Sequence, residues 1–130
     1  MPDWCNHSNI PIFYFKGQLQ EYCQWESFHA SCPSGEVIDI ESAHYGRMQL
    51  GRCLTTDYYI GCSADVLLQV QQRCSGKQNC VIDIPDPELF SLQPCRKDLQ
   101  AYFAASYSCV KGIIFIDFLI GHLSVLSRPF

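Results

Sequence analysis

Cysteine is the residue type with the clearest chemistry in this sequence. The chain has nine cysteines in 130 residues, and eight of them fall between Cys23 and Cys109. Thiols this dense in a short chain are typical of domains held by disulfide bonds, because a small core alone does not offset the entropy lost when the backbone is ordered. We therefore expect an extracellular domain made in the secretory pathway, and a recognition module rather than a metabolic enzyme.

The ninth cysteine, Cys5, precedes this cluster and is left over if the other eight form four bridges. We interpret it as a free thiol, with an intermolecular disulfide as the alternative. Eight cysteines allow on the order of a hundred pairings, so their number alone leaves the connectivity open. No signal peptide is visible in this chain, and we interpret the chain as truncated, as the product of an incomplete gene prediction, or as a piece of a larger ectodomain whose signal lies upstream.

Other reactive side chains give little support to catalysis. The sequence has no Gly-x-Ser-x-Gly elbow, no phosphate-binding glycine loop and no His-Glu-x-x-His helix. Asp86, Glu88 and Asp98 could supply a glycosidase pair, but they cluster around a proline-containing loop where solvation explains them. No Cys-x2-Cys or His-x3-His spacing indicates a metal site. We predict that the protein is not an enzyme and needs no cofactor or metal.

The composition is that of one globular domain. Hydrophobic residues make up 48% of the chain and charged residues 17%, and 130 residues is an ordinary length for a single domain. The formal net charge is -4, and Arg96-Lys97 is the only adjacent basic pair. Because nucleic acids and anionic membranes bind basic surfaces, we exclude nucleic acid as a partner.

The elements that must position these residues can be read from the pattern. Residues 37–40, 80–84 and 102–109 have the composition of strands. Residues 64–74 show helical spacing of apolar side chains, and Ser63 is the expected N-cap. Short strands with at least one helix anchored by cysteines predict an α+β domain.

The end of the chain differs from its middle. Gly112 to Leu126 is strongly apolar but is interrupted by Asp117 and His122, and it is shorter than the roughly 18 residues of a membrane span. We interpret it as an amphipathic or docked helix, with a membrane span as the alternative. The expected organisation is an N-terminal extension at 1–21, a cysteine-rich domain at 22–110 and an apolar tail at 111–130.

The order of motifs between Tyr22 and Val110 is specific. It runs Cys-x8-Cys-x-x-Gly-x-Val-Ile, then Ala-x-Tyr-Gly-Arg, a helix ending in Cys-x-Gly-Lys-x-x-Cys, Pro-Cys, and a final Tyr-x-Cys. This order resembles the galactose/rhamnose-binding lectin domain first described in sea urchin egg lectin (SUEL). The resemblance implies a small, disulfide-stapled antiparallel β-sandwich-like domain with one or more short helices.

The resemblance also implies a pairing of the eight clustered cysteines. By order along the chain, the implied disulfides are Cys23–Cys53, Cys32–Cys109, Cys62–Cys95 and Cys74–Cys80. The second of these closes nearly the whole domain, and a loop of that length contributes roughly 4 kcal/mol in the chain-entropy model.

By the same resemblance, a sugar site is implied. Its residues in this chain are Gln24, Tyr45, Arg47, Gln93, Lys97 and Asp98. Gln24 stands where the family has Glu, and Gln93 stands where it has Asp, so we expect an altered sugar site with weaker hydrogen bonds.

Each of these residues also has a structural interpretation. Tyr45 could simply pack beside Gly46, Arg47 could pair with Asp39 or Glu41, and Lys97 and Asp98 could be solvated loop charges.

We therefore predict a carbohydrate-binding (lectin) module for galactose- or rhamnose-like sugars, whose partners are glycans or a glycoprotein at a cell surface. A membrane is expected to be contacted only through the C-terminal tail. The alternative is an extracellular adhesion module that binds a protein partner and has lost sugar binding, since similar domains occur in adhesion receptors.

Overall fold

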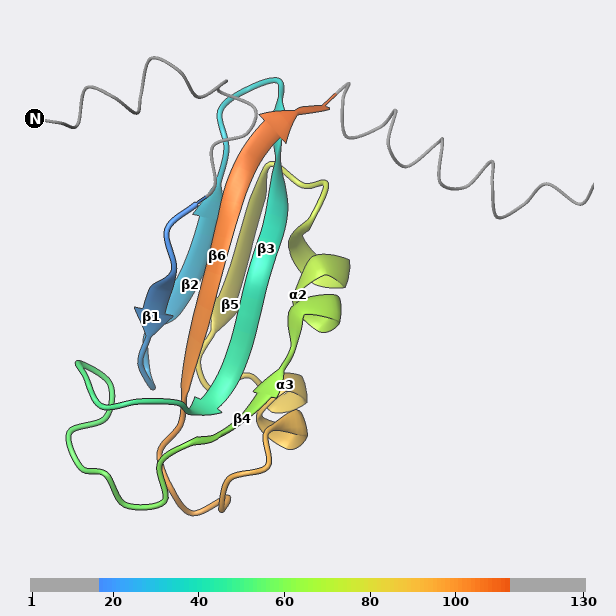
Figure 1. Ribbon diagram of the computed structural model, residues 1–130. Coiled ribbons are helices and arrows are strands. Elements are labelled where there is room, and N and C mark those ends of the chain that lie inside the picture. Colours follow the sequence, from blue (N-terminus) through green and yellow to red (C-terminus); the bar gives the residue numbers. More distant parts are fainter. Residues whose placement is uncertain (1–16, 113–130) are drawn as a thin grey trace, which may run out of the picture.

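Two antiparallel sheets pack together in the computed structural model, which describes residues 17–112 (Figure 1). The larger sheet has the strand order β1-β6-β3-β4, and the smaller one pairs β2 with β5. In chain order the strands are β1 (Gln20–Tyr22), β2 (Ser27–Ser31), β3 (Glu36–Arg47), β4 (Cys62–Asp65), β5 (Asn79–Asp83) and β6 (Tyr102–Lys111). The expectations for Cys5 and for the membrane role of the apolar tail concern residues outside this range.

Two short helices complete the part of the chain that the structure describes. Helix α2 (Leu67–Cys74) lies along β3, and helix α3 (Pro87–Leu92) precedes the loop that leads into β6 (Figure 1). The domain is therefore α+β, with antiparallel sheets stapled by disulfides, and the predicted fold class is confirmed. Within residues 17–112, no helix is long and apolar enough to cross a bilayer.

The core lies between the two sheets and under α2. Phe28 of β2 meets Phe103 of β6 edge to face, with ring centroids 5.3 Å apart, and Tyr22 of β1 meets Phe28 at 5.2 Å. Such edge-to-face pairs add to the stabilisation that comes from burying the rings. Val70 and Cys74 of α2 are fully buried against this cluster.

A bulge in β3 decides which of its residues face the core. One extra residue, Glu41, interrupts the pairing with β6 between Ile40 and Ser42. Before the bulge the even-numbered Ile40 is buried, whereas after it the odd-numbered Tyr45 is buried. Because side chains alternate along a strand, a single inserted residue reverses the two faces, and this reversal turns Tyr45 inward.

Gly46, between two of the predicted site residues, lets β4 approach β3 closely. It has a φ of +155°, and a Cβ placed there would lie 2.4 Å from the carbonyl oxygen of Cys62. Since that neighbour is backbone, it has little freedom to move away. Glycine at this position therefore follows from the close approach of the two strands.

The strands predicted at 37–40 and 102–109 lie within β3 and β6, and the one predicted at 80–84 corresponds to β5, which ends one residue earlier. The predicted helix start is wrong. Ser63 pairs with Gly46 inside β4, and the helix begins only at Leu67. The Asp65 carboxylate, rather than Ser63, accepts a hydrogen bond from the Leu67 N–H at 2.9 Å. The open edge of β3 offers a ladder of backbone partners to residues 62–65, and this tertiary pairing overrides the local capping signal.

Four disulfides tie the described residues together, and they join the pairs that the resemblance implies: Cys23–Cys53, Cys32–Cys109, Cys62–Cys95 and Cys74–Cys80. The Cys32–Cys109 bridge links the end of β2 to β6 across a sequence separation of 77 residues. The Cys62–Cys95 bridge fixes the loop after α3 to β4, which holds that loop beside the end of β3.

Candidate functional site

A cavity of about 430 Å³ opens where three loops meet at the end of the domain that carries α3. The loops are the turn after β1, the segment between β5 and α3, and the connection from α3 to β6. The cavity is lined by Gln24, Tyr45, Pro85, Asp86, Pro87, Phe90, Lys97, Asp98, Leu99, Gln100 and Ala101. Four of the six predicted sugar-site residues, Gln24, Tyr45, Lys97 and Asp98, are thus brought together.

Tyr45 lines the cavity from its inner side. The residue is only 1% exposed, and its ring lies 6.5 Å from that of Phe103 in the core. Burial, together with the negative charge of Asp86, raises the pKa of the Tyr45 phenol to about 12. The hydroxyl therefore stays neutral at physiological pH, and a neutral hydroxyl can both donate and accept a hydrogen bond.

Gln24 is held in the cavity lining by a tight turn. The carbonyl of Cys23 accepts a hydrogen bond from the Glu26 N–H at 3.0 Å, and the Glu26 carboxylate accepts one from the Cys23 N–H at 2.8 Å. Arg52 in turn donates to Glu26 at 2.6 and 3.0 Å. These contacts fix the backbone on both sides of Gln24, so its amide is presented from a defined position.

Lys97 and Asp98 belong to the loop before β6, and both are bonded to their neighbours. The ammonium of Lys97 donates to the carbonyl of Phe90 at 2.9 Å and lies 5.2 Å from the centre of that ring. Asp98 accepts two hydrogen bonds from the exposed Arg96, at 3.1 and 2.8 Å, and these bonds hold the pKa of Asp98 below its usual value. The carboxylate of Asp98 therefore stays charged.

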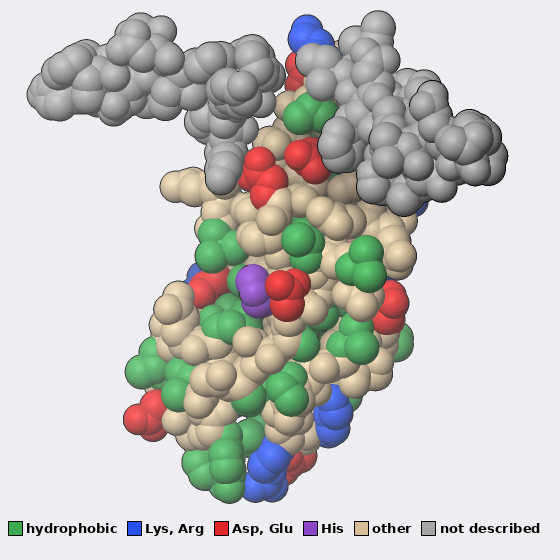
Figure 2. Space-filling view, turned by 45° about the vertical axis from the view of Figure 1, so that its right-hand side comes forward, with side chains coloured by type: hydrophobic (Ala, Val, Ile, Leu, Met, Phe, Trp, Pro, Cys, Tyr) green, Lys and Arg blue, Asp and Glu red, His purple; other side chains and the backbone are tan. Residues whose placement is uncertain are grey.

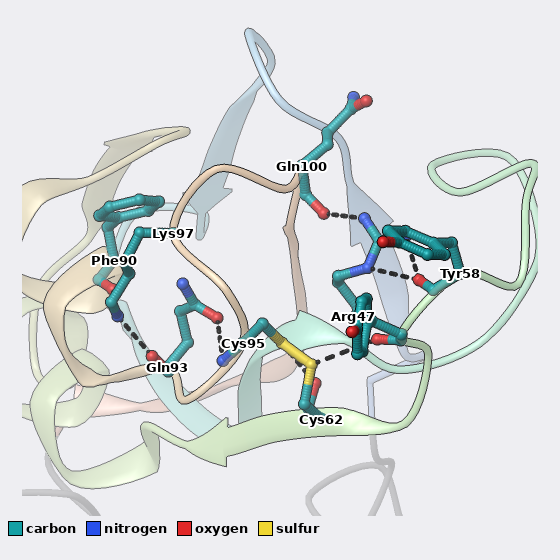
Figure 3. The surroundings of a disulfide bond; sticks show 9 residues. Arg47, Tyr58, Cys62, Phe90, Gln93, Cys95, Lys97 and Gln100 are labelled. Carbon is teal, nitrogen blue, oxygen red and sulfur yellow. Dashed lines mark hydrogen bonds between the residues drawn. A yellow bond between two sulfur atoms is a disulfide. The ribbon is translucent and has the colours of Figure 1, made fainter.

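Arg47 does not line the cavity but supports its wall. The side chain is 4% exposed, and its guanidinium donates to the carbonyl of Tyr58 at 3.2 and 2.7 Å and to the carbonyl of Gln100 at 2.5 Å (Figure 3). The expected alternative pairing with Asp39 or Glu41 is wrong, because the end of β3 carries Arg47 toward two loops instead. Gln100 lines the cavity, so Arg47 fixes the position of one cavity residue through its backbone.

Gln93 is likewise outside the cavity lining. It is 1% exposed, and its amide oxygen accepts a hydrogen bond from the Cys95 N–H at 2.9 Å (Figure 3). Its amide nitrogen is buried without a partner among the described residues. Gln93 thus shapes the loop that carries Lys97 and Asp98, and its direct contact with a sugar stays a prediction.

Asp86 is a cavity residue that sequence reasoning did not include in the site. It caps α3 by accepting a hydrogen bond from the Leu89 N–H at 3.2 Å, and it pairs with Arg73 of α2 at 2.8 Å. The sequence carries a signal for this helix that we did not use: an Asp followed directly by Pro87 is typical of an N-cap with proline at the first helical position.

The ionisation of Asp86 couples this site to stability. Partial burial favours the neutral acid, but the hydrogen bonds from Arg73 and Leu89 outweigh it and hold the pKa of Asp86 below its usual 3.8. A depressed carboxyl pKa contributes stability that is present above the unfolded-state pKa and is lost as the pH falls through the folded-state pKa.

We expect Asp86→Asn to lower the free energy of unfolding by about 1 kcal/mol at pH 7, because a neutral amide bonds more weakly to Arg73 than a carboxylate does. The difference from the unsubstituted protein should shrink as the pH falls below about 4, where the carboxyl group of the unfolded chain becomes protonated, and it should be lost once the pH has fallen through the lower folded-state pKa of Asp86. Urea unfolding at pH 7 and pH 3 checks this. Glu88→Gln is the control, since Glu88 lies 3.7 Å from the same arginine but is 52% exposed. An equal difference at both pH values would contradict the expectation.

No three His, Cys, Asp or Glu side chains between residues 17 and 112 are grouped as metal ligands. The cavity instead offers a neutral phenol, amides, an ammonium group and carboxylates beside the apolar Phe90 and Leu99. Such a mixture suits a neutral ligand that has both hydroxyl groups and apolar faces.

Comparisons with known proteins agree with this chemistry. The family model of the D-galactoside/L-rhamnose binding SUEL lectin domain matches residues 30–109. Protein eva-1 homolog C of Homo sapiens is 29% identical to this chain over 121 residues, as is that of Pan troglodytes, and the Mus musculus protein is 28% identical. Each alignment covers 84% of this chain but 27% of the relative, so the chain spans about a quarter of the length of these proteins.

Proposed function

The chain belongs to the family of SUEL lectin domains, and from this premise we propose that it recognises galactose- or rhamnose-like sugars in the cavity around Tyr45. The observation that carries the proposal is the convergence of Gln24, Tyr45, Lys97 and Asp98 on one cavity from separate loops. The whole protein's partners are, on this proposal, glycans or a glycoprotein.

On this proposal, each cavity residue makes the kind of contact with the sugar that its side-chain chemistry allows. Asp98, whose carboxylate stays charged, accepts hydrogen bonds from sugar hydroxyls, while the amide of Gln24 both donates and accepts. The neutral Tyr45 hydroxyl bonds a further oxygen from the inner side. Phe90 and Leu99 provide apolar surface for the C–H face of the ring. Two hydrogen bonds from Arg96 already use part of the acceptor capacity of Asp98, so fewer of its lone pairs are left for sugar hydroxyls, which favours weak monosaccharide affinity.

Binding rather than catalysis is the function that the carboxylates support. A glycosidase needs one carboxylic acid with a raised pKa to protonate the leaving group. In this cavity Asp86 and Asp98 both have lowered pKa values, because each is hydrogen-bonded to an arginine. Two ionised carboxylates can accept hydrogen bonds from a sugar but cannot deliver a proton to it.

We further propose an extracellular location, since the domain has four disulfides within residues 17–112 and disulfides form and persist chiefly in oxidising compartments. Nucleic acid is not among the proposed partners. On the face seen in Figure 2, basic side chains lie among acidic and hydrophobic ones rather than forming one basic patch. The formal net charge of -4 agrees with this.

Gln24→Glu tests the sugar site. A carboxylate at this cavity position adds a charge-assisted acceptor, which is stronger than a neutral hydrogen bond by about 1 kcal/mol, so the affinity should rise about fivefold. Titration calorimetry of the oxidised chain with L-rhamnose and with D-galactose measures the change.

Gln93→Asp is the matched control for Gln24→Glu. It restores the other family carboxylate at a residue that is 1% exposed and outside the cavity lining, so we expect no gain in sugar affinity. If Gln93→Asp strengthens binding and Gln24→Glu does not, the sugar contacts lie on the other side of the 93–98 loop. Absence of sugar binding by all three proteins would contradict the proposed function.

The alternative function, binding of a protein partner, has one specific observation in its favour. Tyr58 and Tyr59 are each 54% exposed and pack edge to face with ring centroids 4.5 Å apart, and Arg96 lies 5.3 Å from the centre of the Tyr59 ring. Tyrosine and arginine are enriched at the centres of protein interfaces. Retention of a glycoprotein ligand after its glycans are removed would favour this alternative.

A further inference from the structure

Trp25 combines strain with exposure. Its backbone has a φ of +75°, the left-handed region that residues other than glycine rarely adopt, and its side chain is 80% exposed. Glycine is the residue that usually fills such a turn position, because it has no Cβ to clash. A large apolar side chain in a strained and exposed place gains nothing evident for the folded state, and strain of this kind clusters at ligand sites.

The surrounding contacts hold Trp25 at the rim of the cavity. Its N–H donates to the carbonyl of Ile84 at 2.8 Å, and Ile84 directly precedes the lining residue Pro85. On its other side it follows Gln24, which also lines the cavity. The disulfide from Cys23 and the hydrogen bonds of Glu26 fix the turn on both sides. These contacts fix the backbone of Trp25 beside the cavity lining, although Trp25 is not one of the lining residues.

We propose that Trp25 forms a second subsite, on which the next sugar of an oligosaccharide stacks when its terminal sugar occupies the cavity. This inference rests on the proposed function. An indole face is suited to the C–H face of a pyranose ring, because its π-electrons attract the partly positive hydrogens. The two residues next to Trp25 in the chain, Gln24 and Glu26, are polar and can hydrogen-bond the hydroxyl groups of a sugar that stacks on the indole.

The test compares lactose with methyl β-D-galactoside, because the two share a galactose and differ in the second ring. Calorimetry on the oxidised 130-residue chain should give lactose an affinity about threefold to tenfold higher. In Trp25→Gly the two affinities should become equal, with the affinity for methyl β-D-galactoside unchanged. Trp25→Tyr keeps a ring and should retain part of the lactose advantage.

The stability of Trp25→Gly shows whether Trp25 serves ligand binding or the folded structure. We expect Trp25→Gly to unfold at the same urea concentration or a higher one, because relief of the positive φ offsets the extra freedom of glycine in the unfolded chain. A clear loss of stability, or an unchanged lactose advantage, would overturn the second subsite while leaving the proposed function in place. If the unsubstituted chain binds neither galactoside, the second subsite is overturned. The proposed function fails as well only if L-rhamnose is not bound either, and the exposed indole then favours the protein-binding alternative.

Discussion

Replacing both Cys32 and Cys109 by alanine is expected to lower the free energy of unfolding by roughly 4 kcal/mol. The bridge between them closes a sequence separation of 77 residues, and a long closed loop removes more conformational freedom from the unfolded chain than a short one. It also ties β6, the central partner of β1 and β3, to the end of β2. For a domain of this size, a loss of that magnitude is a large part of the total stability.

Cys74→Ala with Cys80→Ala is the comparison for this variant. That bridge spans a separation of 6 residues, and the chain-entropy model gives it about 2 kcal/mol less than the long bridge. Urea unfolding of both double variants, each with the other three disulfides intact, measures the difference. Equal losses would show that the packing around the sulfur atoms, and not loop closure, decides the effect.

Arg47→Ala is expected to have the second large effect, a loss of about 3 kcal/mol or more in the free energy of unfolding. The buried guanidinium bonds the carbonyls of Tyr58 and Gln100, and alanine would leave both oxygens without this partner. A hydrogen bond to a charged group contributes roughly 1.5–3 kcal/mol. Sugar affinity should fall as well, because Gln100 belongs to the cavity wall.

Two further substitutions sharpen the test of Arg47. Arg47→Lys keeps the charge but has no planar fork that can reach two loops, so we expect it to recover only part of the stability. Arg52→Ala removes an arginine that is 55% exposed and paired with Glu26, and such solvent-screened surface pairs contribute little to stability. If Arg47→Ala is no more harmful than Arg52→Ala, the role assigned to the buried guanidinium is wrong.

The sequence alone predicted the family, and through the family resemblance it predicted the four disulfides. The spacing of eight cysteines around Tyr45-Gly46-Arg47 is specific to one family of domains, and that family has the fold class that the structure confirms. The strands now seen as β3, β5 and β6 were also predicted, because β-branched and aromatic residues bounded by turn signals are a local property. The Asp86-Pro87 signal for α3 was local too, and it was available in the sequence.

The arrangement of the site was decided only by tertiary structure. A bulge at Glu41 turns Tyr45 inward, and no local pattern shows where a strand gains an extra residue relative to its partner. Ser63 carries a helix-capping signal, yet the edge of β3 recruits it into β4. Arg47 and Gln93 belong to the same motifs as the cavity residues, but neither lines the cavity: a long-range hydrogen bond holds Arg47 against the backbone of Gln100, and Gln93 is buried. The order of the motifs can be read from the residue types along the chain. Whether a side chain points into the cavity, however, depends on contacts with residues that are distant in sequence.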